Sequence, residues 1–215
     1  MKDIKVSVLI ANYNNEQYLT ECIDSIKKQT YQNVEIIIHD DASSDNSIKR
    51  INKYKNIKII KNKKRGKYGS YNQMNAYNRA FKISNGEIIF LLDSDDLFSK
   101  NKIKNVINAF SKNKKITSLF DLPIYKYKEK LKFIKNKKKF VSNYWPYIPP
   151  QSCIVIKREE FKKIFNKINF NLFPDIWMDF RIALYLKYIS KNFFILNKNL
   201  TIYRQSSEMI SSKFI

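Results

Sequence analysis

Residues 86–96 read GEIIFLLDSDD, and this stretch decides the fold. The strand predicted at residues 87–92 is short, apolar from Ile88 onward, and stops at a cluster of acids, which is typical of a buried strand in an α/β sheet. In sheets of this kind, ligands bind beyond the carboxyl ends of the strands. The stretch therefore predicts a central strand whose end delivers carboxylates to a ligand-binding edge.

The chain before this strand alternates strands with helices. A β-branched run at residues 6–11 precedes residues 17–28, whose apolar side chains recur at the spacing of one helix face. This alternation implies a mostly parallel central sheet covered on both faces, and the predicted fold class is an α/β, Rossmann-like three-layer sandwich. The predicted strands are residues 6–11, 34–38, 57–60 and 87–92, and the predicted helices are residues 17–28, 46–54 and 71–84.

The second half of the chain has a less regular pattern. The basic stretch at residues 128–139 is interpreted as a solvated excursion or a hairpin. Pro146, Pro149 and Pro150 fix an aromatic loop. The remaining elements are predicted as helices at residues 101–111, 158–165 and 177–190 and as strands at residues 118–127, 153–156 and 193–203.

The chain carries a formal net charge of +22. A field of this size attracts phosphates, nucleic acid or anionic lipid headgroups. Compositional drift is an alternative explanation, because lysine, asparagine and isoleucine crowd the whole chain while glycine is limited to 3 residues. Charge alone does not decide between drift, an anionic membrane surface and nucleic acid.

Length and cysteine content indicate one intracellular domain. The 215 residues suffice for a single α/β domain with a hydrophobic core. Cys22 and Cys153 lie far apart without a metal-binding spacing, so neither a disulfide scaffold nor a zinc site is indicated. The N-terminus reads as a charged and then strand-like segment, not as a signal peptide or membrane span. We expect a cytoplasmic protein with peripheral contact to the inner membrane face.

Three carboxylates follow the apolar strand, from Asp93, Asp95 and Asp96. A hard divalent cation is their natural counter-ion. Carboxylates that alternate through Ser94 can share one metal and one neighbouring ribose, and a metal on two phosphates makes a nucleoside diphosphate a competent leaving group. The alternative is an acidic strand end that caps the next helix.

A second acidic pair, Asp40 and Asp41, follows the second predicted strand. Helix capping explains one of the two acids. The other can accept the ring N–H of uracil, while Asn12 and Tyr13 supply a backbone contact and a stacking face. No G-x-G-x-x-G or P-loop follows the first strand, so a diphosphate must be held by metal and side chains. His39, the only histidine, is interpreted as structural.

Three motifs occur in order along the first half of the chain. Residues 6–14 read VSVLIANYN, residues 40–47 read DDASSDNS, and residues 86–96 complete the set. Between the first two motifs the pattern continues at Leu19, Cys22, Ser25, Ile26, Gln29 and Thr30. The chain thereby resembles a family 2 glycosyltransferase of the GT-A fold.

The resemblance implies roles for the acidic and aromatic residues. The nucleobase-binding positions of the family are matched by Ala11, Tyr13 and Asp41, with Asp40 adjoining them. Asp93 matches the ribose-facing acid, and Asp95 matches the ligand of a Mn²⁺ or Mg²⁺ cofactor. Because the acidic run continues to Asp96, the metal assignment can shift by one residue.

Members of this family invert the anomeric centre, which requires a base on the acceptor side. Residues 173–181 read FPDIWMDFR and resemble the family's acidic motif ahead of an arginine-bearing helix. Asp175, just before the helix, is the first candidate base and Asp179 the second. Pro174 stands where the family has a glutamate, which leaves open that Asp175 caps the helix and Asp179 pairs with a lysine.

Residues 203–207, YRQSS, resemble the closing segment in which a basic residue approaches the diphosphate. Gln205 replaces the usual histidine. Arg204 remains a candidate phosphate partner, because a guanidinium binds oxygen pairs in a fork, and an exposed surface arginine is the alternative. Arg65 and Asn78 are further donor-site candidates.

The resemblance implies an inverting transferase that moves a sugar from a UDP-sugar to a hydroxyl of a surface or lipid-linked glycan. Residues 1–96 would bind the nucleotide and residues 97–215 the acceptor. Tyr144, Trp145 and Tyr147 could form an acceptor platform or pack the loop. One alternative is a nucleotidyltransferase of similar fold, which should show a glycine-rich, lysine-bearing loop. The other is a nonenzymatic basic protein on membranes or nucleic acid, although no nucleic-acid partner is expected.

Overall fold

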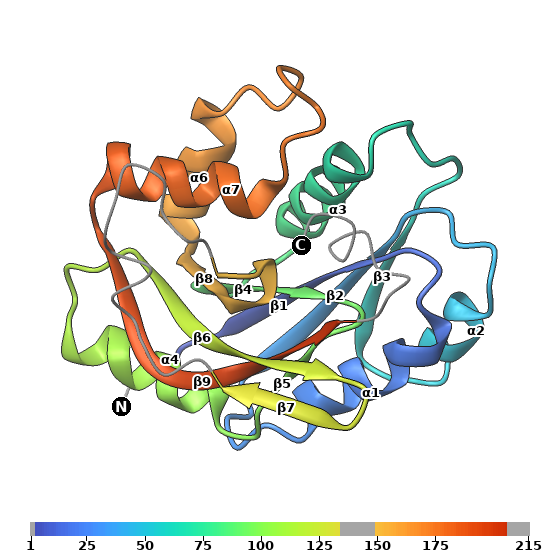
Figure 1. Cartoon of the computed structure of the whole chain (residues 1–215), viewed down its shortest axis with the longest axis horizontal. Coiled ribbons are helices and arrows are strands. Elements are labelled where there is room, and N and C mark those ends of the chain that lie inside the picture. Colours follow the sequence, from blue (N-terminus) through green and yellow to red (C-terminus); the bar gives the residue numbers. More distant parts are fainter. Residues whose placement is uncertain (1–2, 134–148, 206–215) are drawn as a thin grey trace.

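The computed structural model describes residues 3–133 and 149–205. In these residues strands and helices form a layered α/β structure (Figure 1). The strands are β1 (Val6–Asn12), β2 (Val34–Asp40), β3 (Ile57–Lys61), β4 (Ile88–Asp93), β5 (Leu97–Phe98), β6 (Ser118–Tyr127), β7 (Lys130–Phe133), β8 (Ile154–Lys157) and β9 (Phe193–Gln205). The helices are α1 (Glu16–Lys27), α2 (Ser47–Ile51), α3 (Gly69–Lys82), α4 (Lys102–Lys112), α6 (Arg158–Lys167) and α7 (Met178–Tyr185), with short turns η1 (Gln151–Cys153) and η2 (Leu186–Ser190).

All described strands belong to one sheet, in the order β3-β2-β1-β4-β8-β6-β9-β5, with β7 paired to β6. The first four strands are parallel, as the sequence predicts. Asn12 of β1 is in register with Asp40 of β2, and Ala11 is in register with Asp93 of β4. The two acidic clusters therefore meet at one edge of the sheet.

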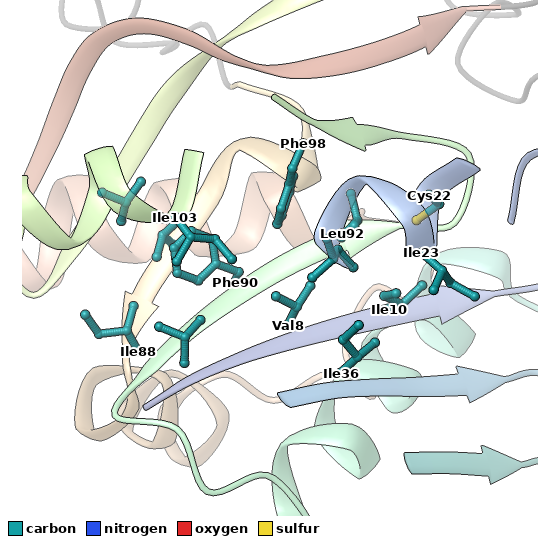
Figure 2. Close-up of a cluster of buried hydrophobic side chains, with 14 of the residues drawn as sticks. Val8, Ile10, Cys22, Ile23, Ile36, Ile88, Phe90, Leu92, Phe98 and Ile103 are labelled. Carbon is teal, nitrogen blue, oxygen red and sulfur yellow. The ribbon is translucent and has the colours of Figure 1, made fainter. Parts of the chain in front are cut away.

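The apolar strands are buried on both faces of the sheet. Val8 and Ile10 of β1 pack against the face covered by α1 and α4, whereas Leu9 packs against the face covered by α3. Figure 2 shows the first face, where Phe90 of β4 lies close to Ile103 of α4. Burial on both faces explains why these strands read as continuous apolar runs.

The second half extends the sheet with antiparallel pairs. β8 is antiparallel to β4 and to β6, and β9 runs parallel to β6 and antiparallel to β5. The sheet thus runs without a break from the nucleotide half expected at residues 1–96 into the rest of the chain. The continuity matters for the site, because β9 brings Arg204 back to the acidic edge.

Several elements differ from the sequence prediction. The two-residue strand β5 is too short to show an alternating pattern. The helix predicted at residues 46–54 is confined to α2, and the helix predicted at residues 177–190 passes into a π-helical turn, η2. The hairpin reading of the basic stretch is confirmed by β7. Its residues 134–139, and the loop with Tyr144, Trp145 and Tyr147, lie outside the described residues.

No helix within residues 3–133 and 149–205 combines the length and the apolar character needed to cross a bilayer. Cys22 and Cys153 are both buried free thiols. Neither position is linked to the other, in agreement with the spacing argument.

Gly86 opens the stretch that decides the fold, and it lies against the start of β1. Its N–H donates to Ser7 Oγ at 2.8 Å. A Cβ at this position would lie 2.6 Å from the carbonyl carbon of Val6 and would also overlap the backbone nitrogen of Ser7. Only a residue without a side chain allows β1 and the entry to β4 to approach this closely.

We predict that Gly86→Ala destabilises the protein by about 2 kcal/mol, because backbone must move to relieve the overlap. Chemical denaturation measures the change. The matched control is Gly69→Ala, where the nearest atoms to a new Cβ are 3.7 Å away, an ordinary contact. Equal stability of the two variants would contradict the close approach.

Candidate active site

The site is built on the turn between β4 and β5, which we call the acidic turn (Asp93–Asp96). Asp96 N donates to the Asp93 carbonyl at 3.0 Å, and Ser94 N donates to the Ala11 carbonyl at 3.2 Å. Ser94 is buried, and its hydroxyl accepts from Asn15 Nδ2 at 2.8 Å. The turn is therefore anchored to the end of β1, and the predicted donor contact Ser94 has a structural partner.

Asp93 is partly buried at the end of β4. Its Oδ1 accepts from Gln73 Nε2 and from the Tyr77 hydroxyl, each at 2.8 Å. Both donors lie one turn apart on α3, on the face toward the sheet. Burial, followed by the charge of Asp95, raises the pKa of Asp93 to about 7.

Asp96 is fully buried and joins three segments of the chain. Its Oδ2 accepts from Ser152 Oγ at 2.6 Å, and its Oδ1 accepts from the backbone N–H of Arg204 at 3.0 Å. Burial and the charges of Asp95 and Asp93 raise its pKa well above the usual range. Both oxygens of Asp96 thus already have donors from the protein.

Asp95 is partly exposed between these two acids. Among the residues that the structure describes, no side chain donates a hydrogen bond to its carboxylate. Burial raises its pKa, while the nearby charge of Arg204 lowers it. Asp95 is therefore the acid of the turn whose oxygens are left for a ligand.

The acidic turn fits a divalent cation that takes most of its ligands from elsewhere. In residues 3–133 and 149–205, no three His, Cys, Asp or Glu side chains are arranged to hold a metal ion. Asp95, with Asp93 beside it, offers carboxylate oxygens, and burial raises the pKa of both groups because it removes water from the charged form. Mg²⁺-type sites commonly use one or two carboxylates and complete the shell with phosphate oxygens and water.

The second acidic pair lies across β1 from the acidic turn. Asp40 is buried, and its Oδ2 accepts from Asn12 Nδ2 and Ser43 Oγ, each at 2.7 Å. Asp41 accepts from Asn62 Nδ2 at 2.9 Å, and its Oδ2 lies 3.2 Å from Arg65 Nε. Asp40 therefore shapes the loop, and Asp41 lies in a polar cluster at the carboxyl edge of the sheet.

An aromatic ring lies beside this cluster. The guanidinium of Arg65 lies 3.3 Å from the centre of the Tyr13 ring, and Tyr13 is 37% exposed. The stack fixes the ring and leaves part of it open to a planar ligand. His39 is buried behind the cluster with both ring nitrogens unpartnered, and burial lowers its pKa, so it is a neutral core residue.

The structure separates the two candidate bases. Asp175 is exposed in the loop before α7 and makes no hydrogen bond or ion pair with any described residue. Asp179 lies in the first turn of α7, partly buried, and its charge helps to raise the pKa of Asp93. Burial raises the pKa of Asp179 to about 6. Asp179 is thus the acid of this motif that faces the acidic turn.

The loop before α7 is held in place from two sides. The Ser70 hydroxyl donates to the Pro174 carbonyl, and Arg181 Nε donates to the Ile176 carbonyl at 3.1 Å. Arg181 also donates to the Leu172 carbonyl at 2.6 Å. The arginine of the sequence motif therefore fixes the loop and does not point at the acids. Asn78 makes no side-chain hydrogen bond within the described residues.

Arg204 closes the site from β9. Its guanidinium pairs with Glu21 and lies 4.8 Å from the centre of the Tyr18 ring, both on α1. Its charge also lowers the pKa of Asp95, against the rise that burial causes. The side chain therefore lies close enough to the acidic turn for its charge to affect Asp95, and its role as a phosphate partner stays a prediction.

A buried ion pair lies behind the acidic turn. Lys102 Nζ, fully buried, donates to Asp121 Oδ1 at 2.8 Å and to the Ser152 carbonyl at 2.7 Å. Thr201 Oγ1 donates to Asp121 Oδ2 at 2.8 Å. Because Ser152 also holds Asp96, the ion pair supports the turn through one shared residue.

Sequence reasoning missed the supporting residues of the site. Gln73 and Tyr77 lie at i and i+4 on the predicted helix at residues 71–84, which is a signal that they share a face. Asn62 directly follows β3 at the ligand edge and could have been found by that position. Lys102 and Ser152 carry no signal in a chain with so many lysines and serines.

Comparison with known proteins places this geometry in a class. The fold is the GT-A fold: Staphylococcus aureus TarS 1-349 in complex with UDP-GlcNAc superposes with a TM-score of 0.72 at 20% identity, covering 97% of this chain and 61% of that chain. The mannosyltransferase PcManGT from Pyrobaculum calidifontis, in complex with GDP-Man and Mn²⁺, gives 0.68 at 17% identity, with coverages of 96% and 58%.

The family model of glycosyl transferase family 2 matches residues 7–183, and the chain belongs to that family. Escherichia coli WfgD, a UDP-Glc:alpha-D-GlcNAc-diphosphoundecaprenol beta-1,3-glucosyltransferase, is 36% identical over 113 residues, which are 53% of this chain and 44% of that protein. The chain spans about half the length, or less, of the curated relatives it matches.

The raised pKa of Asp93 makes stability depend on pH. Its value of about 7 in the fold lies above the ordinary 3.8, so the folded protein holds a proton that the unfolded chain has lost. The contribution of protonated Asp93 to the stability of the fold is therefore fully present below pH 3.8 and is lost as the pH rises through about 7.

We predict that the temperature midpoint of unfolding, measured in EDTA, decreases as the pH is raised from 5 to 7. The decrease should be smaller in Asp93→Asn, because the amide cannot ionise. Thermal unfolding followed by circular dichroism at constant ionic strength measures both. A variant that keeps the full pH slope would show that Asp93 is not the group responsible.

Proposed function

We propose that this chain is an inverting glycosyltransferase that moves a sugar from a UDP-sugar to a hydroxyl of a glycan acceptor. One observation carries the proposal: the acidic turn lies between the Tyr13–Asp41 cluster on one side and Asp179 on the other. A nucleotide on the first side would place its diphosphate at the turn and its sugar near α7. Family membership favours this reaction over nucleotidyl transfer or a nonenzymatic role.

The nucleotide would be held by the ends of β1 and β2. The open part of the Tyr13 ring would stack on the base, and Asp41 would accept a ring N–H of uracil. Asp93, held by Gln73 and Tyr77, would receive the ribose hydroxyls. WfgD is named for a UDP-Glc donor and TarS was solved with UDP-GlcNAc, which supports UDP as the nucleotide here.

Asp95, with help from Asp93, would hold Mn²⁺ or Mg²⁺ against the diphosphate. A bound cation would supply charge neutralisation for the departing UDP. Arg204 would add a second positive charge from the opposite side of the turn, since its field already reaches Asp95. Asp96 would stay outside the metal shell, because donors from Ser152 and Arg204 occupy both of its oxygens.

Asp179 is the residue that we assign as the base, in preference to Asp175. Its carboxylate would take the proton of the acceptor hydroxyl while that oxygen bonds to the anomeric carbon and the bond from this carbon to the diphosphate oxygen breaks. A pKa of about 6 leaves the group ionised at neutral pH and still basic enough to accept a proton. The exposed Asp175 lacks contact with the acidic turn.

The acceptor is proposed to be a lipid-linked or surface glycan, reached from the cytoplasmic side of an anionic membrane. WfgD is named for a diphosphoundecaprenol-linked acceptor. The net charge of +22 suits a peripheral position on such a membrane. Residues 97–205 would form the acceptor side, since α7 and its base belong to this part.

We predict that Asp179→Asn lowers kcat by about 10²–10⁴-fold while the KM for the donor changes little, because the amide cannot take the proton. Wild-type kcat/KM should fall as pH drops through about 6. The assay is UDP release from a panel of UDP-sugars with Mn²⁺ and a glycan acceptor. Asp175→Asn, the matched control, should retain activity.

The opposite pattern, an inactive Asp175→Asn beside an active Asp179→Asn, would return the role of base to Asp175. Asp95→Asn should lose turnover together with its dependence on Mn²⁺. An Asp95→Asn enzyme that keeps both would exclude Asp95 as the ligand of the metal.

A further inference from the structure

The hairpin formed by the end of β6 and by β7, residues 124–133, is amphipathic and open to solvent. We call it the β6–β7 hairpin. Every residue of β7 is exposed, and β7 pairs with β6 at the side of the sheet. Its large apolar side chains are about half exposed: Tyr127 at 48%, Leu131 at 50% and Phe133 at 52%.

The register places Leu131 and Phe133 on one face of the hairpin and Tyr127, Lys130 and Lys132 on the other. Ile124 pairs with Phe133, and Lys126 pairs with Leu131. Paired residues of an antiparallel ladder share a face, so Leu131 and Phe133 lie next to each other on the same face. An exposed apolar pair at the side of a sheet indicates an interaction surface.

The hairpin also carries a concentrated positive charge. Lysines occupy alternate positions across the turn, and Glu129 is the single acid between them. The lysines are Lys126, Lys128, Lys130 and Lys132. Long lysine side chains beside half-exposed apolar groups match the interface of an anionic bilayer, where headgroups meet the acyl region.

The hairpin lies directly beside the candidate active site. Lys126 of β6 is in register with Arg204 of β9, whose N–H holds Asp96 at 3.0 Å. The charge of Lys126 also helps Arg204 to lower the pKa of Glu21, the ion-pair partner of Arg204. Figure 1 shows β7 at the lower rim of the molecule, beside the end of β6. A bilayer bound to the hairpin would therefore lie close to the acidic turn.

We infer that the β6–β7 hairpin docks the protein on an anionic lipid bilayer, with Leu131 and Phe133 at the acyl boundary and the hairpin lysines on the headgroups. The inference deepens the proposed function, because a docked hairpin would hold the acidic turn close to a lipid-linked acceptor. A second copy of the chain pairing with β7 is the competing occupant. The lysines oppose it, since charged edge strands repel one another.

Vesicle flotation of the full chain tests the inference, with phosphatidylcholine vesicles alone and with vesicles that also contain phosphatidylglycerol. The chain should float only with the anionic vesicles. The triple variant Lys128→Glu, Lys130→Glu, Lys132→Glu should lower the bound fraction at least about tenfold, because each basic group at the surface contributes to binding. Leu131→Ser with Phe133→Ser should lower binding and leave the charge unchanged.

Each variant has a matched control elsewhere on the surface. Lys112 at the end of α4, and Lys114 and Lys115 between α4 and the opposite end of β6, are exposed, so their triple change to Glu alters the net charge equally. The apolar control is Leu172→Ser with Phe173→Ser, at 57% and 72% exposure. Both controls should keep binding within about twofold, since surface charge acts only within a Debye length.

Equal loss in the two lysine triples would overturn the inference in favour of the diffuse field of the whole chain. Absence of binding to anionic vesicles would also overturn it, as would a hairpin variant that changes the oligomeric mass by light scattering and leaves vesicle binding intact. Sugar transfer to a water-soluble acceptor, which needs no membrane, distinguishes failure of the docking inference from failure of the proposed function. All variants should keep that activity if only docking is affected.

Discussion

The hydroxyl of Ser152 is the interaction on which the arrangement of the site depends. It accepts from Asp93 N at 3.0 Å and donates to Asp96 Oδ2 at 2.6 Å, so one side chain holds both ends of the acidic turn. Lys102 holds the Ser152 carbonyl from behind at 2.7 Å. Since Ser152 comes from the second half of the chain and the turn from the first, the site exists only when the two halves form one sheet.

This clamp has an electrostatic consequence. Burial of Asp93, Asp95 and Asp96 in one short turn raises the pKa of all three, and the charges of neighbouring acids add to the rise at Asp93 and Asp96. The folded chain is thereby less stable when the acids are ionised, and a cation at the turn would offset that cost. Asp96 is compensated by protein donors, so the attraction is concentrated at Asp95. The proposed affinity for a metal–diphosphate and the cost of ionising the buried acids would be two results of one geometry.

The sequence predicts the first half of the fold because each element there follows a local pattern. Apolar runs that end in acids mark β4 and β2, and the positions of Asp93 and Asp41 follow from the shared edge of parallel strands. The residues that hold these acids in place could not be predicted in the same way. Ser152 reaches the turn because β8, which follows it, pairs with β4 and β6, and Lys102 reaches Ser152 from the start of α4. No local pattern encodes either contact. The ranking of Asp175 above Asp179 depended on loop position alone, whereas burial and proximity to Asp93 appear only in three dimensions.

The most direct test of the account is the affinity of Mn²⁺ for the protein with and without UDP, measured by isothermal titration calorimetry. Two carboxylates make a weak metal site alone, and a diphosphate completes it, so UDP should tighten Mn²⁺ binding at least about tenfold. Asp95→Asn should abolish this coupling. Binding of UDP with the same affinity whether or not Mn²⁺ is present would contradict the claim that the acidic turn holds a cation against the diphosphate.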